Sequence, residues 1–190
     1  MHEKIKLVEA EYFLNQMVKL QGDYLQFTFN LSAFLSATSS VVYFMEEELK
    51  DSVNEKWLVE KKESKLLRFF KFTRNLNNHM RPCRPAKDVT LMVPVTVIST
   101  TLGGVAITSS GTITTQPNVP ALEIPKVEAK HNYRFDENFF NETSSYFSET
   151  NKQFCKSVFN KYDVLTFSNQ WLKELEEIVN EAISKKYISG

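Results

Sequence analysis

The sequence predicts one mainly α-helical domain with a small β insertion, and three observations lead to this prediction. Apolar residues recur every three or four positions in residues 4–20, 66–80 and 154–183, as they do along one side of a helix. The 190 residues include only 5 Gly and 6 Pro but 15 Phe, a composition that favours helices around an apolar core. After Lys87 the apolar spacing changes to two, which is the period of a strand.

Two helices are expected at the start of the chain. Residues 4–20 carry apolar residues at near-helical spacing among Lys and Glu, namely Leu7, Leu14, Met17 and Val18. Gly22 then favours the end of this helix, and Asp23 can cap the start of the next one. From Asp23 to about Lys50 the apolar residues surround the helix, so we expect a buried helix at the centre of the core. Its uncharged run contains too many polar residues for a membrane span.

Two further helices are expected before the period changes. Ser52-Val53-Asn54-Glu55 has the spacing of a capping box, with Trp57 and Leu58 on the short apolar face that follows. Ser64 would begin the next helix, which Pro82 and Pro85 would end. The repeating face of this fourth helix is rich in aromatic residues: Leu66, Phe69, Phe70, Phe72, Leu76 and Met80.

The remainder of the chain is expected to hold the β insertion and a final helical region. Gly103-Gly104 and Ser110-Gly111 suit hairpin turns, so we expect two or three short strands within about residues 88–116. Residues 117–135 are expected to be extended and irregular. One long final helix, or two helices joined near Asp163, would follow. We expect a single domain over 1–190, with its helical core at 4–81 and 150–187 and the β insertion with its irregular connection at 88–135.

Composition excludes several classes of protein. The 23 Lys and Arg balance 23 Asp and Glu, so no overall field would draw the chain to nucleic acid or to anionic lipid. The two Cys and three His form no cluster with metal-ligand spacing, and no glycine-rich phosphate loop occurs, so we expect neither a metal nor a cofactor. Because the amino terminus lacks the apolar stretch of a secretory signal, we expect a cytoplasmic protein that does not enter membranes.

Charge is most uneven between Ser64 and Lys87. This basic segment contains seven cations and no acidic residue: Lys65, Arg68, Lys71, Arg74, Arg81, Arg84 and Lys87. Phosphate contacts supply most nonspecific affinity for nucleic acid, so the segment suggests a site for a polyanion. The alternative is a solvated helix face balanced in space by Glu46, Glu47, Glu48, Glu55 and Glu60.

Inside the basic segment, residues 74–79 read Arg-Asn-Leu-Asn-Asn-His. On a helix Arg74 and Asn78 are four apart, as are Asn75 and His79, so these polar side chains are expected to form one patch. His79 would lie in the last turn before Pro82, where the negative end of the helix dipole favours an imidazolium ion. An alternative is that Arg74 and His79 cap a helix end or pair with glutamates of the second helix.

This pattern resembles the signature of the HEPN superfamily, helical proteins named for higher eukaryotes and prokaryotes nucleotide binding. Arg74, Asn75 and His79 match its arginine, polar residue and histidine. The resemblance covers the first four expected helices and the final one, and does not account for residues 88–135. It implies a helical bundle that forms a homodimer with the motifs facing a shared cleft, and in many members a metal-independent endoribonuclease.

The resemblance also implies roles for individual residues. Two copies of His79 in a dimer would serve as base and acid in cleavage by the RNA 2′-hydroxyl, while Arg74 holds the phosphate and Asn75 orients the phosphate or the ring. Further contacts to RNA phosphates are expected from Lys71, Asn78, Arg81, Arg84 and Arg68.

Two other functions remain open. A noncatalytic helical module would use the basic segment to hold RNA, a nucleotide or an acidic partner protein without turnover. A structural partner in a bacterial defence or toxin–antitoxin pair would cover the uncharged β region with another chain, such as a cognate antitoxin. Cys83, which lies between Pro82 and Arg84 within the basic segment, is expected to be structural rather than reactive.

Overall fold

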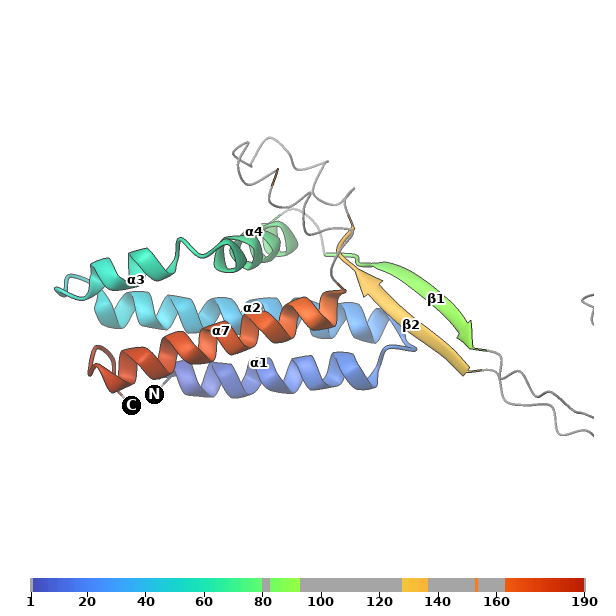
Figure 1. The fold of residues 1–190 in the computed structure, drawn as a ribbon, viewed down its shortest axis with the longest axis horizontal. Coiled ribbons are helices and arrows are strands. Elements are labelled where there is room, and N and C mark those ends of the chain that lie inside the picture. Colours follow the sequence, from blue (N-terminus) through green and yellow to red (C-terminus); the bar gives the residue numbers. More distant parts are fainter. Residues whose placement is uncertain (1, 80–82, 93–127, 137–152, 154–162, 190) are drawn as a thin grey trace, which may run out of the picture. The chain divides into compact units, whose positions relative to one another are not determined.

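The computed structural model describes residues 2–79, 83–92, 128–136, 153 and 163–189 (Figure 1). The chain divides into two compact units, one of residues 1–88 and 131–190 and one of residues 89–130. The described residues form five helices and one antiparallel pair of strands, so the prediction of a mainly α fold with a small β element is confirmed. The hairpin turns expected at 103–104 and 110–111 lie outside the described residues.

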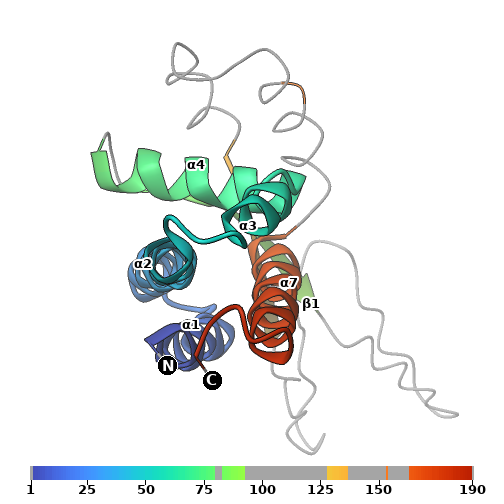
Figure 2. The same cartoon turned by 90° about the vertical axis from the view of Figure 1, so that its left-hand side faces the viewer.

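Three long helices form a bundle in the first unit: α1 (His2–Lys19), α2 (Tyr24–Leu49) and α7 (Val164–Ser184). Figures 1 and 2 show them running alongside one another. Helix α2 packs against each of the other four described helices, as expected for the centre of the core. Its side chains are not buried on every side, however, because Leu25, Phe29 and Tyr43 are more than half exposed. No helix among the described residues is long and apolar enough to cross a membrane.

The ends of these long helices follow local signals in the sequence. The Asp23 carboxylate caps α2 by accepting a hydrogen bond from the Gln26 amide at 3.0 Å. Asp163 caps α7 in the same way, accepting from the Thr166 amide at 2.9 Å. A new helix therefore begins after Asp163, and the expected helical residues 154–162 lie outside the described part of the chain.

Two shorter helices follow α2, namely α3 (Glu55–Lys61) and α4 (Lys65–His79). The prediction of a capping box at the start of α3 is wrong. The Ser52 hydroxyl instead donates to the Leu49 carbonyl at 2.7 Å and accepts a hydrogen bond from the Asn54 amide. Ser64 does begin α4, where its hydroxyl accepts from the Leu67 amide at 3.4 Å. Figure 2 shows α4 crossing over α2 and α7 at a steep angle.

The aromatic face of α4 forms the core between α4 and α7. Phe70 stacks on Trp171, with ring centroids 5.2 Å apart and planes 4° apart. Phe69 meets Phe167 edge to face at 5.1 Å. All four side chains are buried, and aromatic pairs of these geometries add to the stability that burial alone provides. This packing fixes the rotation of α4 and hence which of its residues remain accessible.

The strands are β1 (Ala86–Met92) and β2 (Glu128–Arg134), which pair with each other (Figure 1). The expectation that residues 117–135 are irregular is therefore wrong for 128–134. This strand contains few apolar residues. Among its described side chains, Tyr133 contacts the helical core, where it stacks on Phe27 at 3.8 Å and donates to the Gln21 carbonyl at 2.6 Å. Burial, helped by the charge of Asp23, raises the pKa of Tyr133.

Candidate functional site

Arg74 and Asn75 both line a cavity between α2 and α4, with a volume of about 360 Å³. Helix α4 continues through His79, whose side chain lies outside the described part of the structure. The structure therefore brings two of the three motif residues to one place. The residues around this α2–α4 cavity come from three helices: Ser39, Ser40, Val42, Tyr43 and Glu46 on α2, Leu67, Lys71, Arg74 and Asn75 on α4, and Trp171 on α7.

The Arg74 guanidinium has hydrogen-bonding capacity that the described residues do not use. Its Nη1 donates to Asn75 Oδ1 at 3.1 Å, whereas its Nε is buried and has no partner among the described residues. Leaving a buried N–H group unsatisfied costs about 1–3 kcal/mol. A rotation that directs Nε and a terminal nitrogen together at one anion would remove this cost. Arg74 thus bonds to its neighbour on α4 and not to a glutamate of α2.

The charge of the cavity is predominantly positive. Lys71 is exposed and lies one helical turn before Arg74 and Asn75, so it reaches the same side of α4. Glu46 is the one carboxylate among the described lining residues, and it forms an ion pair with Lys62 at the end of α3. Because Lys62 offsets the charge of Glu46, the two cations of α4 set the sign of the local potential.

The inner wall of the cavity contains a second unsatisfied donor. Trp171 is 2% exposed, and its indole Nε1 is buried without a partner in the described part of the chain. On the α2 side, Ser40 donates its hydroxyl proton to the Ser36 carbonyl at 3.0 Å. Its oxygen retains lone pairs, so Ser40 offers an acceptor to a ligand.

Of the other predicted phosphate contacts, the described residues Arg68, Asn78 and Arg84 do not line this cavity. Asn78 is exposed, and its Oδ1 accepts a hydrogen bond from Asn77 at 3.3 Å. Arg84 is exposed, Arg68 forms an ion pair with Glu63, and Arg81 lies outside the described residues. The contacts thus group Arg74 with Asn75 and Asn78 with Asn77.

Asn77 has a structural role that the sequence did not reveal. Its Nδ2 donates to the Ser32 hydroxyl at 2.7 Å, and its Oδ1 accepts from the Cys83 amide at 2.8 Å. The side chain therefore connects α2, α4 and the segment that follows α4. Cys83 is 2% exposed, so its thiol is shielded by the protein. Nothing in the local sequence distinguishes Asn77 from Asn75 or Asn78.

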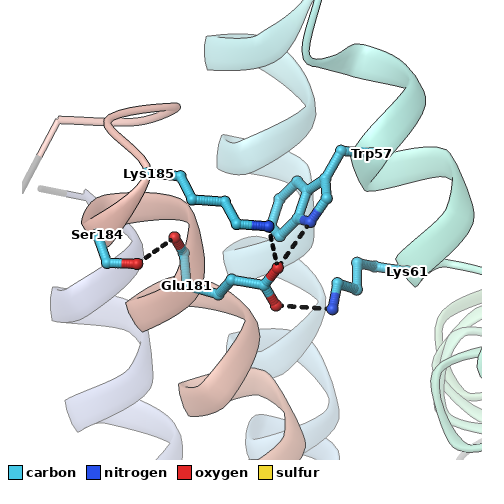
Figure 3. Close-up of polar contacts among 5 residues, drawn as sticks. All are labelled: Trp57, Lys61, Glu181, Ser184 and Lys185. Atoms are coloured by element: carbon cyan, nitrogen blue, oxygen red, sulfur yellow. Dashed lines mark hydrogen bonds and ion pairs between the residues drawn. The ribbon is translucent and has the colours of Figure 1, made fainter.

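A separate polar cluster joins α3 to α7 around Glu181 (Figure 3). The carboxylate accepts hydrogen bonds from Lys185 at 2.7 Å, from Lys61 at 2.7 Å and from the Trp57 indole at 3.1 Å. In that order, these contacts lower the pKa of Glu181 to about 2. Both lysines also lie over the Trp57 ring, so the cluster acts as a structural clamp between α3 and α7.

Comparison with known proteins adds no assignment, because no family model, no curated protein and no solved structure matches the chain. The HEPN resemblance therefore remains a prediction that depends on Arg74, Asn75 and His79.

Proposed function

We propose that this protein binds RNA and holds a backbone phosphate in the α2–α4 cavity. The observation that supports this most directly is the pair of cations on one side of α4, one of which, Arg74, has a buried Nε without a partner in the described residues. A phosphate oxygen is an acceptor that Arg engages with two parallel N–H groups, while Lys supplies a point charge. Asn75 complements them, since its amide nitrogen remains a donor while its oxygen accepts from Arg74.

The choice of RNA among polyanions rests on the sequence. The basic segment concentrates cations on α4 and its exit in a chain of zero net charge, so attraction to phosphate is local. The resemblance of Arg74, Asn75 and His79 to the HEPN signature favours RNA over other phosphate-rich ligands. The cavity and the motif share two residues, which links the sequence argument to the geometry.

A second candidate function is metal-independent endoribonuclease activity by a homodimer. It is favoured by the continuity of α4 through His79, which keeps the backbones of Asn75 and His79 one turn apart. In this proposal one His79 takes the proton of the RNA 2′-hydroxyl, the partner's His79 protonates the departing 5′-oxygen, and Arg74 stabilises the charge on phosphorus.

Binding is tested by fluorescence anisotropy with a labelled single-stranded RNA at fixed salt. Arg74→Ala removes a charge-assisted contact, so the dissociation constant is expected to rise about 10- to 100-fold, and Lys71→Ala should weaken binding as well. The matched control is Lys65→Ala, which removes an exposed cation from the same helix outside the cavity. Equal effects of Arg74→Ala and Lys65→Ala would contradict the proposed site.

Cleavage is tested by incubating the protein with labelled RNA in EDTA and mapping new ends. The nuclease candidate predicts cleavage that His79→Ala and Arg74→Ala abolish, with circular dichroism as the check that both variants are folded. Binding without cleavage would contradict the nuclease candidate and leave noncatalytic RNA binding as the function. Light scattering that reports a monomer under conditions of full cleavage would contradict the shared-site mechanism.

A further inference from the structure

We infer that the α2–α4 cavity takes one whole nucleotide of single-stranded RNA, with the Tyr43 ring as the surface on which its base stacks. This inference rests on the proposed function and adds the part of the RNA that the cavity recognises. It concerns side chains on α2, none of which belongs to the sequence motif.

The size of the cavity indicates a ligand larger than a phosphate. At about 360 Å³ it reaches the range of roughly 300–1,000 Å³ found for pockets that bind small molecules. Water occupies about 30 Å³ per molecule in the liquid, so the cavity has the volume of about a dozen water molecules. A phosphate group has one phosphorus and four oxygens and would leave most of that volume empty. A ribose and a base attached to it would occupy the remainder.

The chemistry of the walls changes from one helix to the other. The cations of the lining, Lys71 and Arg74, lie on α4 and suit the phosphate, whereas its exposed aromatic ring, Tyr43, lies on α2 beside Val42 and polar residues. Tyr43 is 54% exposed although it is a large aromatic residue. Proteins that bind single-stranded nucleic acid pair a cationic groove with accessible aromatic rings, because every base has a face that stacks.

The same arrangement disfavours a duplex. In double-stranded RNA each base is already stacked and paired, so its face cannot reach a ring at the edge of a cavity between two helices. An unpaired nucleotide in a loop or at an end carries no such constraint. Ser40 and Glu46 line the same space and offer acceptor oxygens to the edge of a stacked base.

The inference is tested with a short single-stranded RNA that contains 2-aminopurine, whose fluorescence falls when the base stacks. Tyr43→Ala is expected to weaken binding about 5- to 100-fold and to abolish the quenching, whereas Tyr43→Phe should retain both. The matched control is Phe29→Ala, which removes an aromatic residue of similar exposure from the same helix outside the cavity. Because Tyr43 and Phe29 are both exposed, neither alanine variant should unfold the protein.

Two further probes separate this inference from the proposed function. Polyphosphate, which has no bases, should compete for wild type and Tyr43→Ala equally, and a blunt duplex should bind more weakly than the single strand. If Arg74→Ala weakens RNA binding while Tyr43→Ala behaves like Phe29→Ala, the nucleotide inference is overturned and the phosphate site stands. If Arg74→Ala binds RNA as tightly as wild type does, the proposed function fails and the inference fails with it.

Discussion

Among residues 74–79, Asn77 is the one whose replacement should lower the free energy of unfolding most clearly. In Asn77→Ala the Ser32 hydroxyl loses the donor that lies 2.7 Å away, and the Cys83 amide loses the acceptor at 2.8 Å. A hydrogen bond contributes about 1 kcal/mol net, and more where its loss affects a buried group. Since Cys83 is buried, we expect a loss of about 2–3 kcal/mol in the free energy of unfolding.

The neighbouring position provides the control. Asn78 is exposed, and its side-chain contact in the described residues is a long hydrogen bond from Asn77, so Asn78→Ala should cost no more than about 0.5 kcal/mol. Urea unfolding followed by circular dichroism measures both. A double-mutant cycle with Ser32→Ala isolates the bond between α2 and α4, which should give a coupling energy of about 1 kcal/mol. Equal unfolding midpoints for Asn77→Ala and Asn78→Ala would refute the structural role of Asn77.

Two further predictions concern Glu181 and Cys83. The pKa of Glu181 is lowered from 4.5 to about 2, so its stabilising contribution is complete above about pH 4.5 and is lost as the pH falls toward 2. Melting temperature should therefore fall less steeply over this range for Glu181→Gln than for wild type, while a Glu177→Gln control follows wild type. In a Cys155→Ser background, the buried Cys83 thiol should react with Ellman's reagent only after denaturation, and fast reaction of the native protein would contradict its burial.

The fold could be predicted where its signals are local. Asp23 and Ser64 accept hydrogen bonds from amides only a few residues along the chain, so their caps can be recognised in a short stretch of sequence. The partner of β1 could not be predicted in this way. Its pairing with β2 joins residues about 40 positions apart, and β2 has the polar sequence Glu-Ala-Lys-His-Asn-Tyr-Arg, whose two apolar residues are too few to indicate a strand.

In the candidate site, too, some residues could be identified from the local sequence and others only from the folded structure. Arg74 and Asn75 could be found because both belong to one short pattern on one helix. Tyr43 could not, because its relevance arises only when α4 crosses α2 and leaves a cavity between them. Glu181 was also missed, since the Trp57 indole that it binds lies 124 residues away in sequence.

The claim that Arg74 holds an RNA phosphate is tested most directly at its own Nε atom. In a protein labelled with nitrogen-15, the Nε–Hε signal of Arg74 is identified as the one that disappears in Arg74→Lys. Single-stranded RNA should shift this signal and slow the exchange of its proton with water, because Nε, which has no acceptor among the described residues, gains one from the phosphate. An Arg74 signal that stays unchanged when the protein is saturated with RNA would contradict the phosphate site.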